Sequence, residues 1–191
     1  RRGHPGPAPA VRARLVGPGT NLGPGWTLGP DGLYFRRAAR VLLLDDRDRL
    51  LLVRGHDVDQ PERSWWFTLG GGIDPGETPR RAAVREVREE TGLHLDEDQL
   101  EGPVLTRSAI FDFQREHVRQ DEEFFLARIH RPGPVHLGGW TAVERSFMDE
   151  VRWWDLDDLD EVRLEVFPAG LARLTRELLG GWDGRLRHLE Q

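Results

Sequence analysis

The sequence contains no cysteine, no lysine and no long uninterrupted run of apolar residues. Without cysteine the chain has neither disulfides nor thiolate metal ligands, so nothing in it requires an oxidising compartment. No stretch is long and apolar enough for a membrane span or for the core of a signal peptide. We therefore expect a cytoplasmic protein that makes no membrane contact.

The charge balance is mildly acidic, with 27 basic residues, all arginine, against 33 acidic residues and a formal net charge of −6. No basic block is present, so the sequence does not predict a broad electrostatic grip on a nucleic acid polymer, although small nucleotides remain candidates. A chain of 191 residues, 38% of them hydrophobic, can bury one good core and is short for two. One main domain is expected.

A glycine-rich loop followed by three glutamates is the most informative stretch. Residues 71–93 read GGIDPGETPRRAAVREVREETGL, in which Glu86, Glu89 and Glu90 stand at i, i+3 and i+4. Like charges at this spacing repel one another on a helix. A hard divalent cation such as Mg²⁺ or Mn²⁺ would reverse that penalty, bind phosphate oxygens and lower the pKa of a coordinated water. The stretch predicts a site for divalent metal and diphosphate, and a solvated acidic helix is the alternative.

The ends of the predicted helix are also marked. Thr78 is suited to the N-cap, Pro79 to the first turn, and Gly92 to the left-handed conformation that ends a helix. The helical period places four residues toward the core and the glutamates on the adjoining face: Ala83, Val84, Val87 and Thr91.

The same stretch matches every fixed position of the Nudix box: Gly71, Glu77, Arg85, Glu86, Val87, Glu89, Glu90, Gly92 and Leu93. The chain therefore resembles a Nudix hydrolase. The lead-in WFTLGG (66–71) also matches, although Leu69 stands where proline is commoner. The resemblance implies an α/β (α+β) fold, the Nudix-type α/β/α sandwich around a mixed β-sheet, and metal-dependent hydrolysis of a phosphoanhydride.

The resemblance also implies roles for individual residues. The metal ligands would be the carbonyl of Gly70 and the carboxylates of Glu86, Glu89 and Glu90, and Glu86 is equally arguable as the group that orients or deprotonates water. The residues that would support this site are Gly71, Glu77 and Arg85. A base from the later loop is a further catalytic candidate: Glu144 first, Glu150 second, with Glu122 and Glu123 weaker.

Substrate recognition is less well marked. Arg54 is a candidate phosphate ligand, and Trp66 and Phe111 are candidates for stacking on a base, with core packing as the alternative for both aromatics. The proline and tyrosine signatures of the family's ADP-ribose and dinucleoside polyphosphate branches are missing from residues 107–110.

A nucleotide sugar such as ADP-ribose is slightly preferred as the substrate, because the chain is longer than a minimal Nudix domain. A nucleoside triphosphate pyrophosphohydrolase is the alternative. A non-catalytic nucleotide sensor is disfavoured because the box glutamates are intact, and an isoprenoid diphosphate isomerase because its active site needs a cysteine.

The chain divides at residue 33. Residues 1–33 are rich in glycine and proline and predict an irregular arm, either disordered or exchanged between the subunits of a homodimer. Residues 34–191 are expected to form the catalytic domain. The pattern predicts a hairpin of residues 40–44 and 49–53, strands at 65–67 and 151–154, an antiparallel pair at 104–114 and 123–129, a short helix after Asp155 and a last helix over 168–179.

Overall fold

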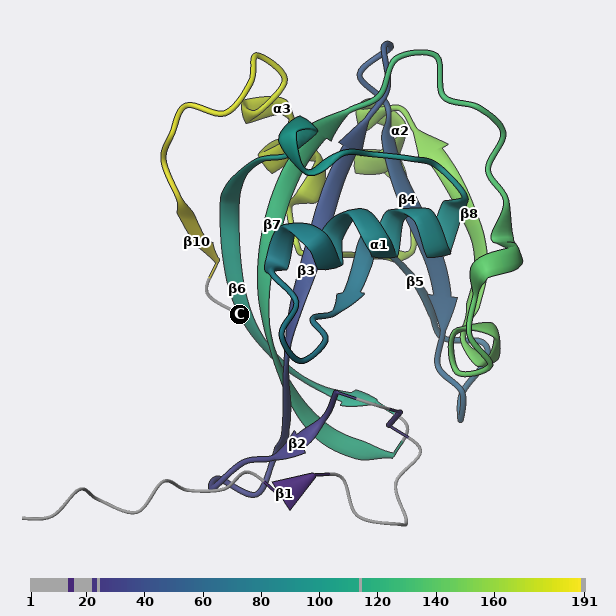
Figure 1. Cartoon of the computed structure of the whole chain (residues 1–191). Helices are drawn as coiled ribbons and strands as arrows, with labels where there is room; N and C mark the ends of the chain where they lie inside the picture. The colour runs from purple at the N-terminus through teal and green to yellow at the C-terminus, as the bar shows by residue number, and fades with distance from the viewer. Residues whose placement is uncertain (1–13, 16–21, 24, 114, 190–191) are drawn as a thin grey trace, which may run out of the picture.

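The computed structural model describes residues 14–15, 22–23, 25–113 and 115–189 (Figure 1). The strands are β1 (Arg14–Leu15), β2 (Thr27–Leu28), β3 (Tyr34–Leu44), β4 (Leu50–His56), β5 (Ser64–Gly72), β6 (Glu101–Phe113), β7 (Glu116–Arg128), β8 (Met148–Trp154), β9 (Glu165–Phe167) and β10 (Arg187–Leu189). The α-helices are α1 (Pro79–Thr91), α2 (Leu156–Glu161) and α3 (Leu171–Glu177), and three short 3-10 turns are η1 (Glu97–Gln99), η2 (Leu137–Gly139) and η3 (Glu144–Ser146).

Strand β3 lies at the centre of one mixed sheet. It runs parallel to β7 along its whole length and antiparallel to the C-terminal half of β5. The N-terminal half of β5 pairs instead with β4, which pairs with β8. Strand β5 therefore connects the two parts of the sheet, and the turn into the box leaves from its glycine-rich end.

The predicted hairpin is present, but its two strands pair only next to the turn. Strands β3 and β4 contact one another as partners only at Leu44 and Leu50, because β5 and β7 occupy the two edges of β3 beyond that point. The turn between them is held by the buried carboxylate of Asp45, which accepts hydrogen bonds from the backbone N–H groups of Arg47 and Arg49, each at 2.9 Å.

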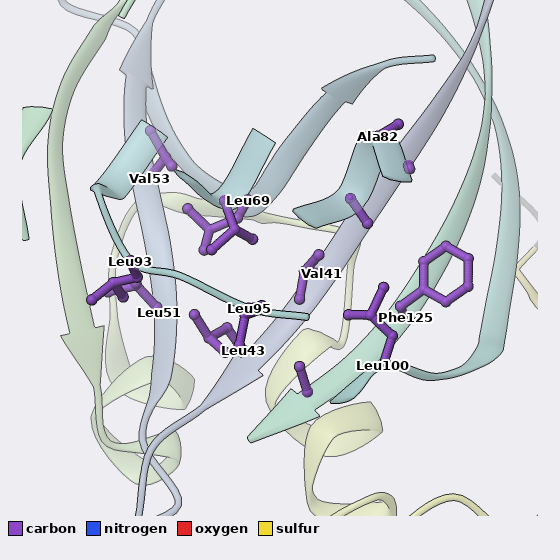
Figure 2. Packing of buried hydrophobic residues seen from close by; sticks show 14 of the residues in the cluster. Val41, Leu43, Leu51, Val53, Leu69, Ala82, Leu93, Leu95, Leu100 and Phe125 are labelled. Carbon is purple, nitrogen blue, oxygen red and sulfur yellow. The ribbon is translucent and has the colours of Figure 1, made fainter. Parts of the chain in front are cut away.

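Two apolar cores flank the sheet. Val41 and Leu43 point toward α1, in the cluster shown in Figure 2, whereas Leu42 and Leu44 point toward α2 and α3. Burial on both faces explains why this strand reads as a continuous apolar run. Helices on both sides of a mixed sheet give the α/β/α sandwich that the sequence predicted (Figure 1).

Helix α1 begins and ends where its capping residues predict. The hydroxyl of Thr78 accepts from the backbone N–H of Arg81 at 3.2 Å, and Gly92 takes the left-handed conformation with φ of 71°. Ala83, Val87 and Thr91 are buried. Glu86 and Glu90 on the adjoining face are buried as well.

Part of the predicted arm packs onto the sheet. Strand β2 pairs with the start of β3, and Leu22 and Trp26 are 2% and 1% exposed in a cluster with Val118 of β7. This part of the arm therefore contacts β3 and β7. Residues 1–13, 16–21 and 24 lie outside the described residues.

Later elements differ from prediction mainly in length. Strands β6 and β7 form the predicted antiparallel pair, each beginning earlier than predicted, and Gln114 lies outside the described residues. The last helix is only α3, which begins after the left-handed residue Gly170. The short edge strands β9 and β10 were not predicted. None of the helices in the described parts of the chain reaches the length and apolar character that a bilayer crossing requires.

Candidate active site

Three carboxylates converge beside the C-terminal half of α1. One carboxylate oxygen each from Glu86, Glu90 and Glu144 lies within 4.8 Å of the others. Glu86 and Glu90 leave α1 in nearly the same direction because they are one helical turn apart. Glu144 comes from η3, in the loop that precedes β8. Hard oxygen donors at this spacing suit Mg²⁺ or Mn²⁺.

Glu90 is the most deeply buried of the three. It is 2% exposed, and its Oε2 accepts a hydrogen bond from the backbone N–H of Gly70 at 2.9 Å. Burial, with the neighbouring charge of Glu86 adding to it, raises the pKa of Glu90 well above its ordinary value. Burial also raises the pKa of Glu86, although the guanidinium of Arg85 opposes that shift. A divalent cation would stabilise both carboxylates in their ionised form, so the donor set fits a metal.

The loop that carries Glu144 is fastened to α1. The indole N–H of Trp140 donates to the backbone carbonyl of Glu90 at 3.0 Å, and the N–H of His136 donates to the carbonyl of Thr91 at 2.8 Å. The backbone N–H of Thr141 donates to Oε2 of Glu144 at 2.6 Å. The same helix therefore positions all three carboxylates.

Glu89 lies at the rim of this cluster. Its side chain is 46% exposed, and its Oε2 accepts from Nη1 of Arg85 at 3.1 Å. The charge of Glu89 still acts on Glu86, so the two are close. The sequence grouped Glu86, Glu89 and Glu90; the structure brings together Glu86, Glu90 and Glu144, because a residue at i+4 faces the sheet here and a residue at i+3 faces solvent.

Arg85 connects helix α1 to the box loop, which is the segment 72–78 from the end of β5 to the start of α1. Its Nε and Nη2 bind the two carboxylate oxygens of Glu77 at 2.9 Å each, and Nη2 also donates to the carbonyl of Gly72 at 2.9 Å. A bidentate pair of this kind fixes orientation as well as distance. The hydrogen bonds from Arg85, against some desolvation, hold the pKa of Glu77 below its ordinary value. These contacts join the loop to the helix, and the supporting role of both residues in catalysis stays a prediction.

Gly70, just before the box, and Gly71, its first residue, are needed for close approach. A Cβ atom at Gly71 would lie 2.6 Å from Oε1 of Glu86. A Cβ at Gly70, where φ is 124°, would lie 2.1 Å from the carbonyl oxygen of Ala39. Any side chain at these positions would displace the carboxylate or the strand.

The carbonyl of Gly70, expected as a metal ligand, already accepts a hydrogen bond. Nη1 of Arg40 donates to it at 2.7 Å. A carbonyl oxygen has two lone pairs, so the role of this oxygen as a metal ligand stays a prediction. Gly70 also supports the cluster through its N–H, which binds Glu90.

The other candidate bases are engaged elsewhere. Glu150 lies opposite Arg54 on the β4–β8 pair, where Nη2 of Arg54 contacts its Oε2 at 3.1 Å. Glu122 is buried between Arg40 and Arg107, with N–O distances of 2.9 and 2.6 Å. Glu123, which is partly buried and on the opposite face of β7 from Glu122, pairs with exposed Arg37.

The three substrate candidates do not gather at the carboxylates. Arg54 forms the ion pair with Glu150, and Trp66 is 3% exposed, edge-on to Trp154 at a ring separation of 5.0 Å in the core below α2 and α3. No face of Trp66 is open to a base, which favours the packing alternative. Phe111 packs on the cluster of Leu22, Trp26 and Val118, in line with the packing alternative.

Sequence reasoning missed the arginines of β3. Arg40 binds Glu122, and Arg36 donates through Nε to the side-chain oxygen of Gln120. Burial and the charge of Arg40 lower the pKa of Arg36 to about 10, opposed by the charges of Glu86, Glu122 and Glu144. The available signal was three arginines, Arg36, Arg37 and Arg40, in an otherwise largely apolar strand. The result is a positive region beside an acidic one, as an anionic substrate and a metal together would require.

Comparison with known proteins also relates this chain to Nudix hydrolases. The chain is 41% identical over 119 residues to a Bacillus subtilis (strain 168) protein provisionally named 8-oxo-dGTP diphosphatase, covering 62% of this chain and 66% of that protein. It is 38% identical over 69 residues to an uncharacterized Nudix hydrolase of the same organism, covering 36% of this chain and 40% of that protein. The chain thus spans less than two thirds of either relative. An RNA pyrophosphohydrolase from Psychrobacter sp. (strain PRwf-1) is 29% identical over 157 residues, covering 75% of this chain and 86% of that protein.

Comparison with solved structures and with the family model supports the resemblance that the box indicated. A MutT NUDIX hydrolase from Burkholderia pseudomallei superposes with a TM-score of 0.52 at 25% identity, covering 76% of this chain and 98% of that one. A MutT protein from Bacillus halodurans gives 0.52 at 23% identity, covering 80% of this chain and 89% of that one. Residues 34–178 match the NUDIX domain. The chain therefore belongs to the Nudix hydrolase family and has the family's α/β/α fold around a mixed sheet.

Proposed function

We propose that this chain hydrolyses a phosphoanhydride bond of a nucleoside triphosphate with the help of Mg²⁺ or Mn²⁺. The observation that supports this most directly is the convergence of Glu86, Glu90 and Glu144 within 4.8 Å. Two of these carboxylates are buried and have raised pKa values. Ionised carboxylates are unfavourable in such a place without a cation, and arginines lie next to them to face an anionic substrate.

A divalent ion bound here would neutralise phosphate charge and make a coordinated water more acidic. Glu86 and Glu90 would hold the ion, and Arg85 would keep the box loop in place. Glu144 is proposed as the further ligand or base. Its Oε2 is held by the N–H of Thr141, which leaves Oε1 to accept a proton from the attacking water. Glu89, at the rim, would act on the cluster through its charge.

Nucleoside triphosphates now rank ahead of nucleotide sugars. The preference for ADP-ribose rested on the extra length of the chain. The described part of that extra length, with Leu22 and Trp26 buried against Val118, packs on its own sheet. The name of the relative with 41% identity points to an oxidised nucleoside triphosphate. These two observations together support the changed order.

A substrate panel tests the proposal. Phosphate and pyrophosphate release would be measured with Mg²⁺ or Mn²⁺ on 8-oxo-dGTP, dGTP, ADP-ribose, a dinucleoside polyphosphate and a 5′-triphosphorylated RNA oligonucleotide. We expect the highest kcat/KM on a nucleoside triphosphate and near-complete loss in the Glu86→Gln variant. A higher kcat/KM on ADP-ribose would reverse the ranking. If no compound is hydrolysed but one of them binds, a nucleotide sensor replaces the enzyme as the best explanation.

A further inference from the structure

The side chain of Arg36 has few polar partners among the described residues. Among the described residues its hydrogen bonding consists of the single bond from Nε to Gln120, and it takes part in none of their ion pairs. A Cβ atom placed on Gly72 would lie 3.5 Å from Nη1 of Arg36. The guanidinium therefore lies against the backbone of the box loop, and its two Nη atoms are the ones left to bind a ligand.

The positive charge of Arg36 interacts with carboxylates of the candidate active site. The carboxylates of Glu86 and Glu144 both act on Arg36, although neither lies within ion-pair distance of it. With its pKa near 10, set mainly by burial, Arg36 remains a cation at neutral pH. A cation that is close to the metal ligands without pairing with them is placed to bind the anion that the metal binds.

The ring of Trp26 lies against one face of the Arg36 guanidinium and restricts its orientation. Cζ of Arg36 lies 4.4 Å from the centroid of the Trp26 ring, and the ring itself is 1% exposed and stacks on Phe113 at 6.2 Å. Stacking restricts the plane of the guanidinium and the bond to Gln120 restricts its rotation within that plane. Trp26 lies before residue 34, outside the part of the chain that matches the family.

We propose that Trp26 and Gln120 orient Arg36 so that its Nη atoms bind phosphate oxygens of the substrate. The segment that carries Trp26 would then be part of the active site, with Trp26 as a positioning residue and Arg36 as the residue that touches substrate. This inference rests on the proposed function, since it assumes that a phosphorylated substrate binds at the three carboxylates.

A double-mutant cycle tests the pair. Arg36→Gln is expected to raise KM for the best nucleoside triphosphate by about tenfold to a hundredfold, as loss of a charge-assisted hydrogen bond predicts, with a smaller change in kcat. Trp26→Leu is expected to raise KM by about threefold to tenfold through loss of the stacked cation. The double variant should match Arg36→Gln alone, because no guanidinium then remains to be oriented. Trp26→Phe should recover most of the loss.

Matched controls separate a local effect from general damage. Arg152 stacks on Trp154 at 4.2 Å, on the opposite face of the sheet from α1. Arg152→Gln removes a comparable contact and should leave KM unchanged. Circular dichroism and thermal melting would show that each variant is folded. Multiplicative effects in the double variant, or an unchanged KM in Arg36→Gln, would overturn the proposal.

The failure of this inference can be told apart from failure of the proposed function. Calorimetric binding of inorganic pyrophosphate with Mg²⁺ gives a dissociation constant that needs no turnover. A wild-type protein that hydrolyses triphosphates while Arg36→Gln binds pyrophosphate equally well keeps the function and rejects the role of Arg36. A wild-type protein that hydrolyses nothing but binds pyrophosphate in an Arg36-dependent way does the reverse. No hydrolysis and no binding would reject both.

Discussion

Glu90→Gln should make the metal-free protein more stable while it destroys the metal site. Glutamine is nearly the same size, and its side-chain oxygen can still accept the hydrogen bond from Gly70. It carries no charge, so the energetic penalty of ionising a group that is 2% exposed disappears. We expect a gain of about 1–3 kcal/mol in unfolding free energy, the usual range for relieving a buried polar group of this kind.

The size of this stabilisation depends on pH. Because burial and Glu86 raise the folded-state pKa of Glu90 above its ordinary value of 4.5, its stabilising contribution is complete at low pH and is lost as pH rises toward the folded pKa. The advantage of Glu90→Gln should therefore be small near pH 5 and grow toward pH 8. For a chain of this length the expected shift in Tm at pH 8 is about 2–12 °C.

The assay is thermal unfolding in a chelator and again with excess Mg²⁺. Wild-type protein should be stabilised by the ion, by about 2.7 kcal/mol at a hundredfold excess over Kd, and Glu90→Gln should lose most of that gain together with hydrolysis. Glu89→Gln is the matched control, since Glu89 is 46% exposed and its pair with Arg85 is a surface contact. A Glu90→Gln protein that melts no higher than wild type in chelator, or that keeps its response to Mg²⁺, would refute the reasoning.

Three further outcomes are expected. Glu144→Gln should lower kcat by about 100-fold or more, as loss of a base predicts, whereas Glu150→Gln should retain nearly full rate because Glu150 pairs with an arginine outside the cluster; equal rates in both variants would leave Glu144 without a role. Gly71→Ala should lower kcat with little change in the far-ultraviolet circular dichroism, since the new methyl group would overlap Oε1 of Glu86; full activity would contradict the close approach. Arg85→Lys should lower unfolding free energy by about 1.5–3 kcal/mol through loss of the bidentate pair, measured by urea titration, and a change below 0.5 kcal/mol would be the contrary result.

The sequence predicted the parts of the fold that depend on local chemistry. Helix α1 has both of its predicted caps, because Thr78 and Gly92 act through their own backbone and side-chain geometry. The pairing of β3 was not predictable in the same way. Its main neighbours are β5 and β7. The sequence of an apolar strand does not indicate which other strands pair with it.

The candidate site was predictable where spacing along one helix decides it. The positions of Glu86 and Glu90 follow from the period of α1. The position of Glu144 depends instead on a contact between its loop and the helix, from Trp140 to Glu90, two residues 50 positions apart in the chain. The arginines of β3 were missed because the sheet brings them beside the box through pairing with β5. Composition alone cannot distinguish them from surface arginines.

The hydrogen bond from Gly70 to Glu90 makes one backbone amide a spectroscopic reporter of the active site. Gly70 lies in β5 opposite Arg40, and its N–H donates to the side-chain carboxylate of Glu90. Its amide proton resonance should shift when Glu90 loses its proton or binds a cation, because the acceptor changes charge. A single glycine signal in an NMR spectrum could then follow metal binding directly, without substrate and without turnover.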